Sequence, residues 1–185
     1  MTLKEAKKKV LALIEEVNPD SAVLTDDPDI AAKINAVINQ IMFELVRIRK
    51  LGKYLELPVV KGQLLSFADL EKACGYEVFQ IQKISGVNAE LRANGSVVKV
   101  MEDGTLEADV FVFPESITEA TKDSYEFELA SDVLEILPYG VAADLLKSDV
   151  SAEYGSVYSN RYETMLTRLD PRYHTGSLYI EGGAF

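Results

Sequence analysis

The chain has 185 residues, of which 48% are hydrophobic and 26% are charged, a composition that is ordinary for a folded protein with its own core. Its net charge is −11, and this sign excludes a protein that holds DNA tightly by its phosphates, because such affinity comes from Lys and Arg. No apolar run is long enough to span a bilayer, so we expect no membrane partner.

The first segment predicts an amphipathic helix. Apolar residues between Leu3 and Val17 recur with a helical period. Thr2 and Glu5 have the spacing of a capping box, in which each side chain bonds the other residue's backbone N–H. We therefore predict a helix from Thr2 to Val17, stopped by Asn18-Pro19.

A second helix and a third, shorter one follow. Asp26–Asp29 includes an early proline and acidic residues, which favour a helix start. The isoleucines that follow predict a helix to Leu51, with Gly52 as its cap. Pro58–Gln63 is predicted to be irregular. Phe67–Cys74, between a serine and a glycine, is predicted to be a short helix.

From Tyr76 the apolar period changes from the helical value to two, which is typical of strands. Asn94-Gly95 and Asp103-Gly104 are both two-residue hairpin signals. The pattern ends at Phe113, before Pro114. We predict a meander of about four short strands.

The helical period returns in the last part of the chain. Ser131 is a suitable cap for a helix that Pro138 and Gly140 are expected to bend or break. A final helix is predicted from about Ser151 to Leu169, ended by Asp170-Pro171.

These elements together predict an α+β fold: a mainly helical core of four to five helices with an inserted small antiparallel β meander. We expect a single domain over 1–185. Its predicted parts are a helical core (1–74 and 124–170), a β subdomain (76–118) and a C-terminal tail (171–185) with a strand-like unit at Ser177–Ile180.

Residues that could carry chemistry are few. His174 lies in the tail, and Cys74 lies at the negative end of a short helix, where a thiolate is disfavoured. The Asp20–Asp29 cluster does not match a calcium loop, and the pairs Glu15-Glu16 and Glu102-Asp103 resemble solvated surface charge. We therefore expect no catalytic, cofactor-binding or metal-binding residues, and a protein that is not an enzyme.

Three tyrosines lie at four-residue spacing on one face of the last predicted helix: Tyr154, Tyr158 and Tyr162. One interpretation is that this face packs on the first two helices. The other is that some rings face a neighbouring subunit, since Tyr and Arg are enriched at interfaces and Arg161 and Arg168 share another face of the same helix.

The segment LPYGVAADLLKSDVSAEYGSVYSNRYETMLTRLDPR, Leu137–Arg172, resembles the head–tail connector (adaptor) proteins of long-tailed bacteriophages and prophages. The shared pattern is a Leu-Pro hinge, a helix of Ala-Ala and Leu-Leu pairs, an acidic break, and a helix with aromatic positions. The segment Asp26–Ile41 also resembles the family's second N-terminal helix.

The resemblance implies a structural virion protein, located in the neck and assembled in the host cytoplasm. It would form a homo-oligomeric ring, commonly of twelve subunits, that docks on the portal protein and carries the next neck or tail component. DNA would pass through the channel without specific binding. A ring requires two different lateral surfaces that fit each other.

The sequence offers two further sets of candidate contact residues. The tail residues Leu178, Tyr179 and Ile180 could add a strand to a partner's sheet. The predicted hairpin tips at Asn94, Gly95, Asp103 and Gly104 are candidates for facing the channel or the next neck component.

Three alternatives remain open from the sequence. A tail-completion or tail-terminator protein would be dominated by sheet. A small binding or regulatory protein unrelated to phage would have a different gene neighbourhood. An enzyme would require a pocket with several titratable groups.

Overall fold

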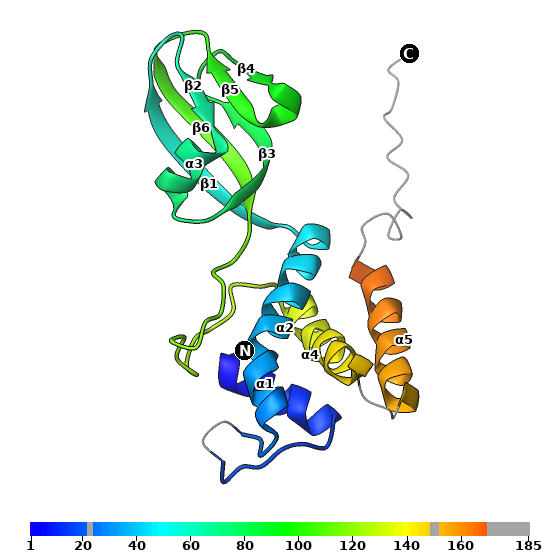
Figure 1. The fold of residues 1–185 in the computed structure, drawn as a ribbon. Coiled ribbons are helices and arrows are strands. Elements are labelled where there is room, and N and C mark those ends of the chain that lie inside the picture. The colour runs from blue at the N-terminus through cyan, green and yellow to red at the C-terminus, as the bar shows by residue number, and fades with distance from the viewer. Residues whose placement is uncertain (22–23, 149–151, 170–185) are drawn as a thin grey trace, which may run out of the picture. The chain divides into compact units, whose positions relative to one another are not determined.

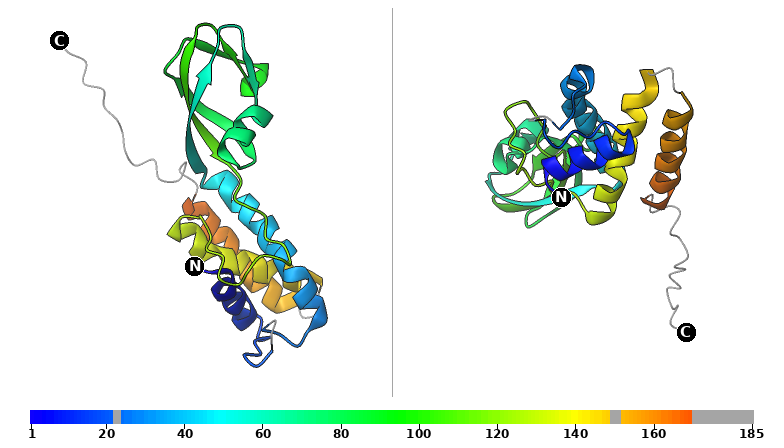
Figure 2. Two further views of the ribbon diagram at one scale, coloured as in Figure 1. Left: turned by 90° about the vertical axis from the view of Figure 1, so that its left-hand side faces the viewer. Right: turned by 90° about the horizontal axis from the view of Figure 1, so that it is seen from below.

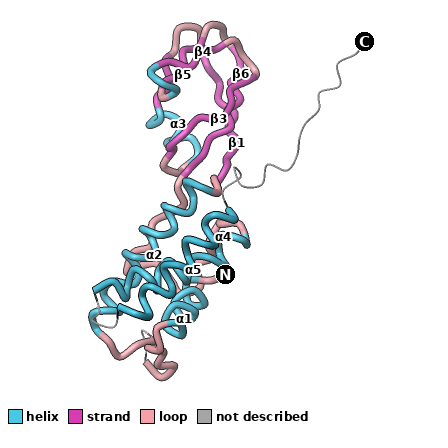
Figure 3. The backbone as a smooth tube through the Cα atoms, turned by 90° about the vertical axis from the view of Figure 1, so that its right-hand side faces the viewer, coloured by secondary structure: helices cyan, strands magenta, loops and turns pink. Residues whose placement is uncertain are grey.

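The computed structural model describes residues 1–21, 24–148 and 152–169, and it confirms the α+β fold. The described chain forms two compact units (Figure 1). A helical unit takes Met1–Arg49 and the described residues from Ile117 onward, and a β unit takes Lys50–Ser116. Figure 3 shows the strands gathered in the β unit, with α3 as its one labelled helix.

The two N-terminal helices begin where the sequence predicts. In α1, Leu3–Leu13, the Thr2–Glu5 capping box is formed, but the helix ends well before Asn18. The residue after its C-cap, Glu15, has a φ of 61°, which interrupts the helical path. In α2, Pro28–Ile48, the Asp27 carboxylate accepts hydrogen bonds from two backbone N–H groups of the first turn.

The C-terminal helices correct two predictions. Helix α4, Ser131–Leu145, runs through Pro138 and Gly140 without a break, and its N-cap is Ala130 rather than Ser131. Pro138 removes only one backbone donor, and the apolar surroundings of α4 hold the helix together. A short 3-10 turn follows α4 at Leu146–Ser148, and α5, Ala152–Leu169, ends at the predicted residue.

Helix α4 is the centre of the helical unit. It packs against α1, α2 and α5, and Figure 2 shows it between α5 and the two N-terminal helices. Its buried residues lie around most of its circumference, as expected for a central helix. The core also takes apolar residues from α1 and α2, among them Leu3, Met42 and Leu45, which are fully buried, and Leu169 from α5.

The segment between Ile117 and α4 belongs to the helical unit. The side chain of Asn39 in α2 donates to the Ile117 carbonyl and accepts from the Ile117 N–H, each at 2.8 Å. The Leu3 N–H donates to the Tyr125 carbonyl at 2.8 Å, and Phe127 is buried in the same core. These bonds anchor both ends of the segment to the N-terminal helices.

The β unit contains six strands and one helix: β1 Leu51–Val59, β2 Leu64–Ser66, α3 Phe67–Cys74, β3 Val78–Ser85, β4 Ala89–Arg92, β5 Val97–Val100 and β6 Gly104–Val112. They form two antiparallel three-stranded sheets, ordered β1-β6-β3 and β2-β5-β4. Helix α3 has the predicted bounds, with Ser66 at its N-cap and Gly75 in the left-handed conformation at its C-cap. This unit has its own buried cluster, which includes Leu70, Val98 and Leu106.

The β unit corrects three predictions. It begins at Lys50 rather than at residue 76, because Leu51 and Gly52 belong to β1 rather than to the end of α2. The strands are no meander, since β3 and β6 pair in one sheet while β4 and β5 pair in the other. Asp103-Gly104 therefore connects two sheets and closes no hairpin.

The Asn94-Gly95 hairpin exists, but its loop is longer than a two-residue turn. Arg92 pairs with Val97, so the loop takes all of 93–96. Ala93, Asn94 and Gly95 all have positive φ angles, and Ala93–Gly95 forms a short 3-10 turn.

Candidate functional site

The tyrosine ladder of α5 packs mainly within the helical unit. Tyr162 is 8% exposed and lies against α4, where a Cβ built on Gly140 would come within 2.7 Å of its ring and 2.8 Å of Ile41. Three helices thus meet at Gly140, where a side chain would collide with both neighbours. Burial, and then the negative charge of nearby Glu44, raises the pKa of Tyr162 well above its ordinary value.

Tyr158 links α5 to α1. Its hydroxyl donates a hydrogen bond to the carbonyl of Leu13, the last residue of α1. That carbonyl lies in the last turn, where helix carbonyls lack intrahelical donors. The bond therefore caps α1 and fixes α5 against it.

These contacts decide between the two interpretations for two of the three rings. Tyr162 and Tyr158 support the chain's own packing, and Tyr162 is too buried to be offered to a neighbouring subunit. The side chain of Tyr154 lies outside the described part of the chain, as do the tail residues Leu178, Tyr179 and Ile180.

Arg161 and Arg168 are exposed on α5. The Arg161 guanidinium lies 4.5 Å from the centre of the Tyr139 ring in α4, a cation–π arrangement.

The centre of the outer face of α5 is uncharged, and the exposed Glu163 and Arg168 border it. We call it the α5 face; all its members are exposed: Ser156, Val157, Asn160, Thr164 and Thr167. Val157 is 59% exposed, although it is apolar. The hydroxyls of Thr164 and Thr167 donate to backbone carbonyls of α5 itself, which lowers their need for water. An exposed helix face in so charged a chain would ordinarily carry Glu and Lys.

Helix α2 has a comparable outer face. Ala32, Ala36 and Gln40 lie one turn apart and are exposed, and we call them the α2 face. None of these three is charged, but the exposed Lys33, three residues before Ala36, and the exposed Glu44, four residues after Gln40, border them. Figures 1 and 2 show α4 between α2 and α5, so these two faces lie on different sides of the helical unit.

A pocket of about 440 Å³ lies where α1, α4 and α5 meet; we call it the Tyr139 pocket. Its apolar lining comes from Ala12, Leu13, Pro138, Tyr139 and Met165. Its charged lining residues are Lys9 and Arg161, with Glu135 as the one acid. A pocket with more cations than acids is notable in a chain of net charge −11.

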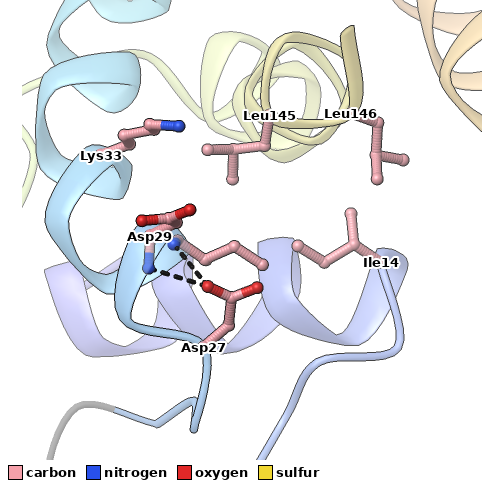
Figure 4. A pocket seen from close by; sticks show the side chains of 7 residues that line it. Ile14, Asp27, Asp29, Lys33, Leu145 and Leu146 are labelled. Atoms are coloured by element: carbon pink, nitrogen blue, oxygen red, sulfur yellow. Dashed lines mark hydrogen bonds between the residues drawn. The ribbon is translucent and has the colours of Figure 1, made fainter. Parts of the chain in front are cut away.

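A second pocket, of about 290 Å³, lies between the end of α1, the start of α2 and the end of α4 (Figure 4). Its acids are Asp27 and Asp29, and Figure 4 shows the Asp27 carboxylate bonded to the first turn of α2. Asp26 accepts a hydrogen bond from the side chain of Asn18 at 2.6 Å. The acidic cluster thus serves caps and turns, and no group suited to a metal ion occurs among the described residues.

The loop candidates of the β unit are exposed, with Gly95 partly so. The Asp103 carboxylate accepts a hydrogen bond from the Lys61 N–H at 2.7 Å, and the neighbouring Glu102 accepts one from the Asn88 N–H, also at 2.7 Å. Both acids of the Glu102-Asp103 pair therefore hold loops together. Asn94 and Asp103 lie in different loops, since the β4–β5 hairpin contains Asn94 and the crossing between sheets contains Asp103.

Sequence reasoning missed Tyr139, Gly140 and the α2 face. Gly140 is predicted from the sequence to bend or break the helix. A glycine within the apolar stretch Leu137–Leu145 also suits a close helix crossing. The α2 face could have been found from the recurrence of Ala32, Ala36 and Gln40 opposite the isoleucine stripe.

No model of a known protein family matches this sequence, and a search of curated proteins gives no significant match. Within the described residues, the helices are too short or too polar to cross a membrane.

Proposed function

We propose that this chain is the subunit of a head–tail connector ring, a structural protein of the virion that docks on a portal and carries the next neck or tail component. The ring extends the DNA channel, and the chain acts by shape and self-association. The observation that carries this proposal is a pair of outer faces whose central residues are uncharged, the α5 face and the α2 face, on different sides of one helical unit.

A closed ring requires a heterologous contact, in which one surface of a subunit meets a different surface of the next. The α5 face and the α2 face are two different surfaces of one subunit, and the side chains that form them are exposed and uncharged. Small side chains allow two helices to approach closely. We therefore propose that the α5 face of one subunit packs on the α2 face of its neighbour, with Val157 opposite the alanines.

The charge of the chain supports the same function. A net charge of −11 repels the DNA phosphates, so packaged DNA can move through a channel built from such subunits without adhering. The resemblance of Leu137–Arg172 to connector proteins supports it further, because this segment forms the end of α4 and all of α5. The four helices of the helical unit favour a connector over a tail terminator, which would be dominated by sheet.

The experiment mixes the purified chain with the portal protein encoded in the same genome and follows assembly by native mass spectrometry and electron microscopy. We expect rings on the portal for the natural chain. Ala36→Arg or Val157→Asp should abolish the rings without lowering the melting temperature, because both positions are exposed in the free chain.

The matched control is Lys8→Glu, an exposed charge change on α1 that lies on neither face. It should assemble normally. Failure of the natural chain to bind the portal, together with its absence from purified virions, would refute the proposed function. Normal assembly of Ala36→Arg and Val157→Asp would refute the assignment of the two faces only.

A further inference from the structure

We propose that the Tyr139 pocket is the docking site for a segment of the chain's own tail, Leu178–Glu181, in the free protein. The pocket joins an apolar floor, including Leu13 and Met165, to the cations Lys9 and Arg161. The segment joins three apolar side chains to one acid, in the order Leu, Tyr, Ile, Glu. The two are therefore complementary in both hydrophobicity and charge.

Charge complementarity selects this segment for the pocket. Arg161 is held above the Tyr139 ring, so its guanidinium is already positioned in the lining of the pocket before any ligand arrives. Lys9 lines the same pocket from α1. Glu135 is the one acid among the lining residues, so an added carboxylate such as that of Glu181 would balance the charges of the lining.

The chain is long enough to make this contact within one molecule. Met165 lines the pocket and lies one helical turn, about 6 Å, before Leu169. Residues 170–177 can extend to about 30 Å, and they include Pro171 and Gly176, which favour turns. A short linker also gives an effective concentration in the millimolar range, so the intramolecular contact prevails over one with a second molecule at ordinary protein concentrations.

This inference concerns the free chain and does not rest on the proposed function. If the proposed function also holds, the docked tail residues would be unable to bind a partner until the Tyr139 pocket releases them.

The test measures disulfide formation within the full chain, in a Cys74→Ala background that removes its one native cysteine. Ala12→Cys places a thiol at the pocket, and Ser177→Cys places another beside the docking segment without replacing any of its residues. We expect an intramolecular disulfide to form at least about tenfold faster than in the control pair Ala36→Cys with Ser177→Cys. Equal rates, or disulfide-linked dimers in place of monomers, would overturn the proposal.

A charge exchange tests the assigned contact. Arg161→Glu and Glu181→Arg should each slow the Ala12–Ser177 disulfide, and the two changes together should restore its rate. Circular dichroism of each variant verifies that the helices are intact. A double variant as slow as the single variants would overturn the pairing of Glu181 with Arg161. None of these measurements needs a portal, so the result is independent of ring assembly.

Discussion

At the scale of single residues, Gly140 controls how closely three helices approach. A Cβ at this position would lie 2.7 Å from the ring of Tyr162 and 2.8 Å from Ile41, so Gly140→Ala forces the helices apart. We expect a loss of about 1–3 kcal/mol in the free energy of unfolding, measured with urea. Gly155→Ala is the matched control, because its Cβ would meet only ordinary contacts, the nearest at 3.4 Å from Leu146.

The two substitutions should have different effects on the free energy of unfolding, which Gly140→Ala lowers and Gly155→Ala does not. At Gly155 the alanine keeps normal packing and has the better helix propensity, by about 1 kcal/mol. Gly155→Ala should therefore be neutral or stabilising. If Gly140→Ala were equally benign, the close crossing at Tyr162 would be absent in solution.

The raised pKa of Tyr162 predicts that the stability of the fold depends on pH. Its pKa in the folded state is raised, by burial first and by Glu44 next, above the ordinary value of 10.0 that applies in the unfolded chain. As the pH rises above about 10, the unfolded state loses this proton while the folded state keeps it, so stability falls with rising pH. Urea unfolding of the natural chain and of Tyr162→Phe between pH 8 and 11 measures the effect.

Tyr162→Phe has no proton to lose, so its stability should fall less over this interval. Near neutral pH the substitution should cost at most about 1 kcal/mol, because the hydroxyl lies near the Glu44 carboxylate without a hydrogen bond of good geometry to it. Parallel pH profiles for the two proteins would show that Tyr162 does not contribute.

At the scale of elements, the Tyr158 hydroxyl joins α5 to the end of α1. Tyr158→Phe keeps the ring and removes this bond, so we expect a loss of about 0.5–1.5 kcal/mol in the free energy of unfolding. Tyr139→Phe is a suitable control, since it keeps the ring beneath Arg161. Equal stabilities for the natural chain and Tyr158→Phe would contradict the capping role.

Elements with strong local signals were predictable from sequence. The serine and glycine around Phe67–Cys74 fix both ends of α3 through local hydrogen bonds and one left-handed residue. Strand β1 was missed, although Leu51, Leu55 and Val59 alternate with exposed residues. Pro58 was assigned to an irregular segment, but β1 is at the edge of its sheet, where a missing N–H is tolerated.

Pairing between distant strands and contacts between helices could not be predicted from the sequence. Nothing local distinguishes a β5–β6 hairpin at Asp103-Gly104 from a crossing between two sheets. The packing of α5 was predictable only in part, because its periodicity identified the tyrosine stripe but not which rings are buried. That depends on Gly140 and Leu13, which are contributed by other helices.

At the scale of the whole molecule, the β unit is an insertion with its own core, and its first and last strands are neighbours. Leu51 pairs with Val112, so their Cα atoms are about 5 Å apart. The ends to be joined are Lys50 and Ile117; Asn39 bonds Ile117 and lies eleven residues before Lys50, so these ends are about 17 Å apart along α2. We predict that a ten-residue Gly/Ser linker, spanning about 17 Å, can replace 51–116 without unfolding the helical unit. Circular dichroism and cooperative thermal unfolding measure this, and residues 50–116 alone should fold as a β protein.

The shortened chain also separates the roles of the two units in assembly. Both proposed lateral faces, on α2 and α5, remain in it, and Asn39 still anchors the chain at Ile117. It should therefore form rings on the portal as the natural chain does, because the lateral contact requires only the helical unit. A folded, helical but non-assembling variant would place an essential ring contact in the β unit and contradict the two-face assignment. A variant that fails to fold would instead show that the helical core depends on the insertion.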